Sequence, residues 1–221
     1  MRRGFTVIEI IFVVTIVAIL IGIAAPRLLE KDDLSLAADQ VIGHIRYTQH
    51  LALMDDRFDP NDARWFESRW QIYFHSNAGS DDKLAYTIFK DNNYNNNPDP
   101  NLDEIARNPL DRSKFLTGGF NSIVPIPVTD PSADPTLCLG CTYDITGINF
   151  SPSCTNHQGE TQSRRISFGE IGRPYYQNAD TNPYRSDRRV LTVCTITLTH
   201  QSGDTARICI EPETGYTHRC D

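Results

Sequence analysis

Residues 4–26 read GFTVIEIIFVVTIVAILIGIAAP, and this stretch decides how the rest of the chain is organised. There are 22 residues from Phe5 to Pro26, which at about 1.5 Å each would form a helix of roughly 33 Å. That length is enough to cross the hydrocarbon core of a bilayer. Because Arg2 and Arg3 precede the stretch, the positive-inside bias predicts a cytoplasmic N-terminus and a translocated remainder.

Glu9 is the one charged residue between Phe5 and Ala25. A lone carboxylate inside an apolar span costs roughly 2.5–3.5 kcal/mol on insertion scales, so we expect Glu9 to have a partner. A plain signal anchor gives no reason for such a residue. A secretory signal peptide needs small residues at a cleavage site after its apolar core, whereas here Ala24 and Ala25 lead into Pro26.

The run Gly4-Phe5-Thr6-Val7-Ile8-Glu9, followed by an apolar helix, resembles the processing site of type IV prepilins and type II secretion pseudopilins. The resemblance implies that a prepilin peptidase cleaves after Gly4 and that Phe5 becomes the N-methylated first residue. It also implies that Glu9 neutralises the terminal amine of a neighbouring subunit. Pro26 resembles the proline that bends the helix in this family, although a proline at the membrane exit would explain it nearly as well.

The resemblance implies a leader peptide at 1–4, a transmembrane and assembly segment at 5–26, and a periplasmic globular domain at 27–221. The expected fold class is α+β: a long N-terminal helix, membrane-spanning in its first half and packed on an antiparallel β-sheet in its second half. Apolar residues at helical spacing extend the predicted helix to about Met54. They are Leu34, Ala38, Val41, Ile45 and Ala52.

Short apolar or alternating runs after the helix predict β-strands. They are Trp70–Phe74, Ala85–Phe89, Ile123–Val128, Ile145–Phe150, Arg165–Phe168 and a hairpin of Val190–His200 with Thr205–Ile210. Between them, residues 91–104 are rich in Asn and Asp and predict a loop. Such oxygen-rich loops can bind calcium, but the spacing matches no EF-hand template, and we do not assign a calcium site.

Two C-terminal stretches carry a weaker resemblance. Residues 166–174 (ISFGEIGRP) and 208–215 (ICIEPETG) are similar to minor pseudopilins of the H type and to FimT-like minor pilins. FimT-like proteins often end in a glycine-arginine element implicated in DNA contact, but here Gly215 is followed by Tyr216. This departure weakens the case for DNA uptake.

All six cysteines lie in the C-terminal part: Cys138, Cys141, Cys154, Cys194, Cys209 and Cys220. Their number favours disulfides in an oxidising compartment. Three precede residue 160 and three follow it, so complete pairing requires an odd number of bridges between the two groups. The alternative is structural zinc, because Cys138, Cys141, Cys154 and His157 have paired-knuckle spacing.

We therefore expect a minor pseudopilin, a structural subunit of a type II secretion pseudopilus or a related type IV pilus-like filament. Expected partners are prepilin peptidase, other pilin-like subunits, an inner-membrane assembly platform and membrane lipid. The alternatives are a minor pilin for motility or DNA uptake, or a membrane-anchored periplasmic binding module.

No enzyme motif stands out and no cofactor is expected. The net charge of −7 disfavours nucleic acid. The expected location is the bacterial inner membrane, with one pass and the C-terminal domain in the periplasm.

Overall fold

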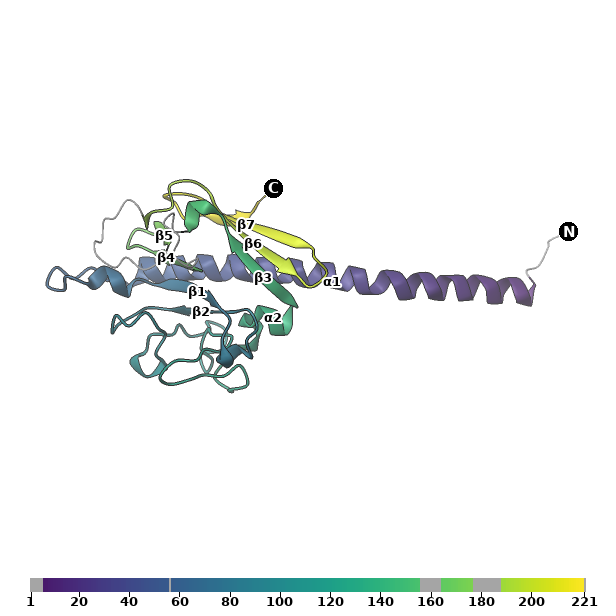
Figure 1. Cartoon of the computed structure of the whole chain (residues 1–221), viewed down its shortest axis with the longest axis horizontal. Coiled ribbons are helices and arrows are strands. Elements are labelled where there is room, and N and C mark those ends of the chain that lie inside the picture. Colours follow the sequence, from purple (N-terminus) through teal and green to yellow (C-terminus); the bar gives the residue numbers. More distant parts are fainter. Residues whose placement is uncertain (1–5, 56, 156–163, 177–187, 221) are drawn as a thin grey trace.

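The computed structural model describes residues 6–55, 57–155, 164–176 and 188–220, with the backbone alone at 22–32 and 102. Helix α1 (Val7–Met54) contains 48 residues. It begins after Thr6, whose side chain accepts a hydrogen bond from the backbone N–H of Glu9, as expected of an N-cap. Its first part projects away from the body of the molecule, while its second part lies among the strands (Figure 1).

The strands form two separate four-stranded antiparallel sheets. The first has the order β2-β1-β4-β5 and the second the order β3-β6-β7-β8. The bounds are β1 (Gln71–His75), β2 (Ala85–Phe89), β3 (Ile145–Phe150), β4 (Arg165–Phe168), β5 (Pro174–Tyr176), β6 (Cys194–His200), β7 (Thr205–Ile210) and β8 (Thr217–Arg219). Short helices lie in the connections: η1 (Trp65–Ser68), η2 (Ala78–Ser80), η3 (Pro100–Leu102), η4 (Pro135–Leu137), α2 (Leu139–Thr142) and η5 (Pro152–Cys154).

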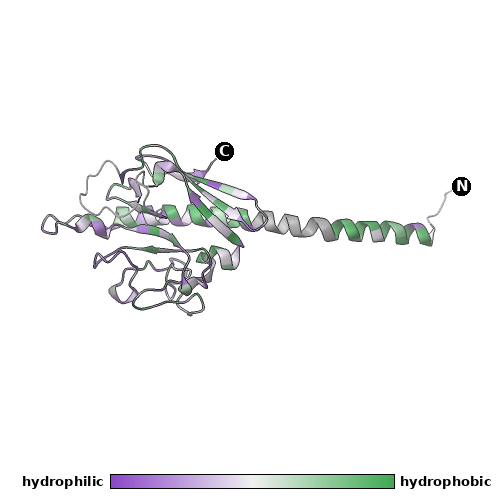
Figure 2. Ribbon diagram, viewed as in Figure 1, coloured by the Kyte–Doolittle hydropathy of each residue, from purple (hydrophilic) through white to green (hydrophobic). Residues whose placement is uncertain are grey.

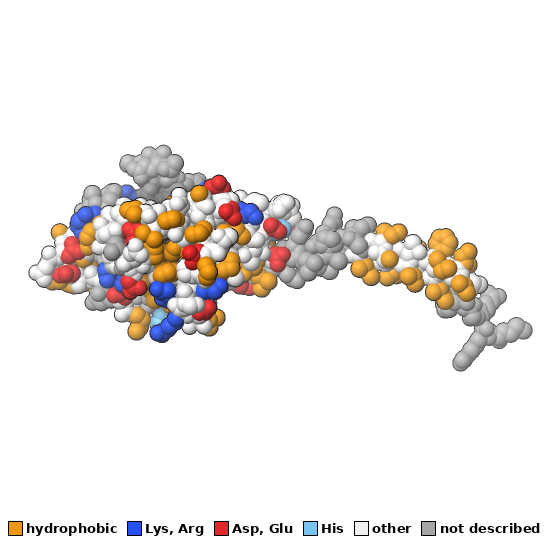
Figure 3. Space-filling model, turned by 90° about the horizontal axis from the view of Figure 1, so that it is seen from below, with side chains coloured by type: hydrophobic (Ala, Val, Ile, Leu, Met, Phe, Trp, Pro, Cys, Tyr) orange, Lys and Arg blue, Asp and Glu red, His pale blue; other side chains and the backbone are white. Residues whose placement is uncertain are grey.

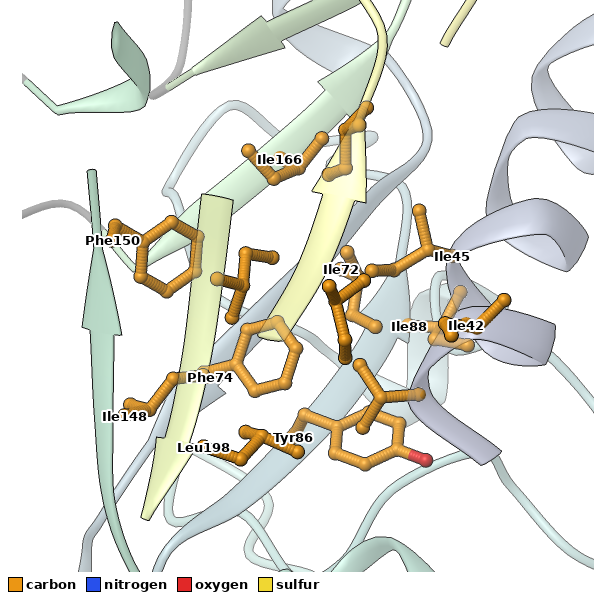
Figure 4. Close-up of a cluster of buried hydrophobic side chains, with 14 of the residues drawn as sticks. Ile42, Ile45, Ile72, Phe74, Tyr86, Ile88, Ile148, Phe150, Ile166 and Leu198 are labelled. Atoms are coloured by element: carbon orange, nitrogen blue, oxygen red, sulfur yellow. The ribbon is translucent and has the colours of Figure 1, made fainter. Parts of the chain in front are cut away.

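The main core lies where both sheets meet the second part of α1. The helix contributes Ile42 and Ile45, the first sheet contributes Phe74 among others, and the second contributes Phe150 among others (Figure 4). The apolar stripe predicted on the helix is confirmed as buried, because each of its five members is at most 5% exposed. Burial of this stripe fixes which face of α1 the sheets cover.

Most predicted strands are confirmed within a residue or two, but the run at 123–128 is wrong. It contributes only an isolated bridge between Phe120 and Ile126. Pro125 and Pro127 remove two backbone donors from this short run, so it cannot sustain a ladder. The hairpin is confirmed with a shorter first strand, and β6 alternates buried residues with partly exposed threonines.

The structure corrects the predicted fold class, in which a long helix spans the membrane with its first half and packs on one antiparallel sheet with its second half. The described strands form two sheets. Within the described ranges, no helix has both the length and the apolar character needed to cross a membrane. The predicted single-pass location in the inner membrane is therefore wrong on this structure.

Candidate assembly site on the N-terminal arm

We call residues 6–21 the N-terminal arm. Every side chain of the arm is exposed, and its large apolar residues range from 46% exposed at Val17 to 76% at Val7. Hydropathy colouring shows the free end of α1 as mainly hydrophobic (Figure 2), and apolar side chains cluster there in the space-filling view (Figure 3). Monomeric soluble proteins rarely expose a continuous apolar surface of this kind, so the arm is suited to contact with a partner.

Glu9 lies in the first turn of α1 and is the only charged residue of the arm. A carboxylate in the first turn is stabilised by the helix dipole, typically by 0.3–1 kcal/mol. This gives Glu9 a local role as well as the predicted intermolecular one. Among the described residues, its carboxylate is in none of the ion pairs, so it is available to a cation from another molecule.

The other predicted processing and assembly residues are only partly described. Gly4 and Phe5 lie outside the described residues, so their role stays a prediction. The backbone of α1 is helical on both sides of Pro26. Its side chain lies in the stretch where the structure describes the backbone alone.

The two C-terminal stretches with the weaker resemblance come together in space. Arg173 and Glu213 form an ion pair at 2.6 Å, and Glu213 also accepts a hydrogen bond from Arg189. The bond from Arg189 is the main reason that the pKa of Glu213 lies below its usual value. This contact joins the turn before β5 to the loop after β7, and so links the two sheets.

All six cysteines are paired. The disulfides are Cys138–Cys141, Cys154–Cys194 and Cys209–Cys220. One bridge, Cys154–Cys194, joins the two groups of three cysteines, in agreement with the expectation that an odd number of bridges must do so. Three of the four residues of the alternative zinc site are in disulfides, so their thiolates are not available, and His157 lies outside the described residues. Three bridges are typical of extracellular or periplasmic proteins.

The loop at residues 91–104 uses its carboxylates to hold its own backbone. Glu104 is fully buried and accepts hydrogen bonds from the backbone N–H groups of Asn92 and Asp99 at 2.7 and 2.8 Å. Asp91 accepts from Asn95 and Asn96 at 3.1 and 2.7 Å. Burial raises the pKa of both Asp91 and Glu104. In the described part of the chain, no group of three or more His, Cys, Asp or Glu is arranged to hold a metal ion.

Sequence reasoning missed two glutamines of α1 that fasten the body to the helix. Gln40 donates to the hydroxyl of Tyr86 and to the carbonyl of Thr136, both at 2.8 Å. Gln49 donates to the carbonyl oxygens of Gly172 and Thr214. Its position in the sequence could have indicated this for Gln49, which follows Ile45 by four residues and therefore lies on the same face of the helix as the buried stripe.

Comparisons with known proteins do not assign the chain to a family. No protein-family model matches it, and no curated protein or solved structure does so either. The chain is therefore classed by its own structure: a helix with an exposed apolar arm, two antiparallel sheets and three disulfides.

Proposed function

We propose that the chain is a structural subunit of a type II secretion pseudopilus or a related type IV pilus-like filament. Its N-terminal arm packs against the arms of neighbouring subunits, and a prepilin peptidase first cleaves it between Gly4 and Phe5. The observation that carries the proposal is the arm itself, which is predominantly apolar, helical from Val7 onward and exposed along its whole described length. Burying such a surface between copies gains about 25 cal/mol for each Å² of apolar area removed from water.

The position of Glu9 supports arm-to-arm packing with a defined stagger. Once arms pack, the Glu9 carboxylate is removed from water, and an unpaired buried charge costs several kcal/mol. The resemblance supplies the counter-charge, because cleavage after Gly4 would create a free amine at Phe5 of each copy. The pair forms only when neighbouring helices have the correct offset, so Glu9 selects the register of the filament.

The disulfides support a site of action outside the reducing cytosol. All three bridges hold the globular body, which lies away from the arm (Figure 1). Bridges of this kind persist in oxidising compartments. The body can therefore remain folded on the outside of an assembled filament.

Filament incorporation of Glu9 variants tests the proposal. We expect Glu9→Gln to reduce recovery of the chain in the sheared filament fraction at least about tenfold, because the buried amine then lacks its counter-charge. Glu9→Asp keeps the charge and should retain part of the incorporation. Thr15→Val is the matched control on the same arm, because the Thr15 hydroxyl bonds only to the carbonyl of Ile11 in the described structure. Normal incorporation of Glu9→Gln would refute the assembly role.

The mature N-terminus is the second readout. Mass spectrometry should find a methylated Phe5 at the start of the wild-type chain and of both Glu9 variants, since cleavage precedes assembly. An uncut leader in the wild-type chain would overturn the proposed processing independently of any result on incorporation.

A further inference from the structure

The three disulfides differ in how exposed their cysteine residues are. Cys154 and Cys194 are both completely buried. In the Cys138–Cys141 bridge, Cys138 is completely buried but Cys141 is exposed. Thiol–disulfide exchange needs the attacking thiolate to reach one sulfur atom directly. Cys141 is therefore the half of its bridge that lies at the surface, whereas Cys138 is protected. In the third bridge, Cys209 is buried and Cys220 is only partly exposed.

The segment around this bridge is held by its own hydrogen bonds. The backbone N–H of Cys138 donates to Pro135 at 3.1 Å, and that of Thr142 donates to Cys138 at 3.0 Å. The N–H of Gly140 donates to the carbonyl of Leu84 at 2.9 Å. A side chain at Gly140 would lie 3.1 Å from Cβ of Lys83 and 3.2 Å from the backbone nitrogen of Leu84. This close approach places α2 against the start of β2 through contacts that involve neither sulfur atom of the bridge.

The hydrogen bonds that hold this segment against α1 also involve no cysteine side chain. The hydroxyl of Tyr143 donates to the side-chain oxygen of Gln40 at 2.7 Å, and Gln40 donates to Thr136 at 2.8 Å. The two ends of the segment are thus fixed to one helix residue.

The short spacing between the two cysteines also indicates that this bridge contributes little to the stability of the fold. Cys138 and Cys141 are three residues apart, whereas the other pairs are separated by 40 and 11 residues. The conformational restriction that a disulfide places on the unfolded chain increases with the length of the loop that it closes. Of the three bridges, Cys138–Cys141 is therefore the one whose loss changes stability least.

We propose that Cys138–Cys141 is a redox-active disulfide that accepts two electrons from a dithiol, with Cys141 as the attacked residue. A donor thiolate forms a bond to Sγ of Cys141 while the Cys138–Cys141 bond breaks, and Cys138 leaves as a thiolate and takes up a proton. The second thiolate of the donor then attacks the donor sulfur in the mixed disulfide, and Cys141 leaves and is protonated. The donor becomes a disulfide, and the bridge becomes two thiols. The proposal is independent of filament assembly.

Differential alkylation of the full chain tests the selectivity. The folded protein is equilibrated in mixtures of reduced and oxidised dithiothreitol, free thiols are trapped with iodoacetamide, and mass spectrometry locates the label. We expect Cys138 and Cys141 to be labelled at a ratio of reduced to oxidised reagent at least about tenfold lower than the ratio needed for the other four cysteines. Reduction of all three bridges together, or of either other bridge first, would overturn the proposal.

Two single substitutions test which sulfur is attacked. Cys138→Ser leaves the exposed Cys141 thiol, and Cys141→Ser leaves the buried Cys138 thiol. With glutathione disulfide as the probe, we expect the Cys138→Ser chain to form a mixed disulfide at least about tenfold faster. Equal rates would refute the role of Cys141. Retention of the other two bridges by mass spectrometry, with an unchanged circular dichroism spectrum, shows that both variants are folded.

Discussion

The side-chain amide of Gln49 donates a hydrogen bond to the backbone carbonyl oxygen of Gly172 at a distance of 2.8 Å. The same nitrogen donates to the carbonyl of Thr214 at 2.7 Å. Gly172 lies in the turn between β4 and β5, and Thr214 lies in the loop between β7 and β8. One side chain of α1 therefore holds loops from both sheets.

Replacing Gln49 by alanine should reduce the free energy of unfolding by about 1–3 kcal/mol, because two carbonyl groups lose their shared donor. Urea unfolding followed by tryptophan fluorescence measures the change. His50→Ala is the matched control, since His50 is the next residue of the same helix and is exposed. The control should change stability by less than about 0.5 kcal/mol. Equal effects of the two substitutions would contradict the role of Gln49.

Gly215 should tolerate alanine less well than Gly203. Both residues have positive φ, at 64° and 92°, so alanine is strained at either position by roughly 1–2 kcal/mol. At Gly215 an added Cβ would also lie 2.6 Å from Nε2 of Gln49 and 2.8 Å from the carbonyl oxygen of Gly172, whereas at Gly203 it would meet no atom within 4 Å. Thermal unfolding of the two variants should show the larger decrease in Tm for Gly215→Ala. The reverse order would be inconsistent with the close approach at Gly215.

The spacing of apolar residues predicted those helices and strands that bury one face and expose the other. The stripe of α1 and the alternation in β6 follow from spacings of about 3.6 and 2 residues, and both are observed. The same reading failed at 123–128, where hydrophobic residues suggested a strand but two prolines prevent the ladder. The sequence analysis also predicted one sheet instead of two, because local residue patterns do not show which distant strands pair with each other.

The disulfide pairing and the contacts that hold the body against α1 were less predictable. Six cysteines allow 15 pairings, so the sequence showed that a bridge must join the two groups but not which one. Gln40 and Gln49 are polar residues whose partners are backbone or hydroxyl oxygens far along the chain, and such partners are fixed only by the completed fold. Glu9, by contrast, stands out locally as a charge in an apolar run, and its assembly role stays a prediction.

Replacing Gly43 by alanine should stabilise the protein by about 0.5–1 kcal/mol. Gly43 lies inside α1 on an exposed position, and an added Cβ would meet no atom within 4 Å. Glycine in a helix interior costs about this amount relative to alanine, because it loses more backbone freedom on folding. Urea unfolding of Gly43→Ala should give a higher midpoint with an unchanged slope. A lower midpoint would show that the position contacts another part of the protein.

The folded protein should lose stability as the pH falls below about 6.5 because of His44. Burial lowers the pKa of His44 from 6.5 to about 4, and its Nδ1 lies 2.6 Å from the hydroxyl of Tyr86. The unfolded chain therefore binds the proton at a higher pH than the folded chain, and stability decreases from pH 6.5 towards pH 4. Between pH 7 and 4.5 the loss attributable to His44 should be about 2–3 kcal/mol. Comparing urea unfolding of the wild type with His44→Gln at both values isolates this contribution, since other titrating groups are common to both chains. An equal loss in the variant would show that a different group is responsible.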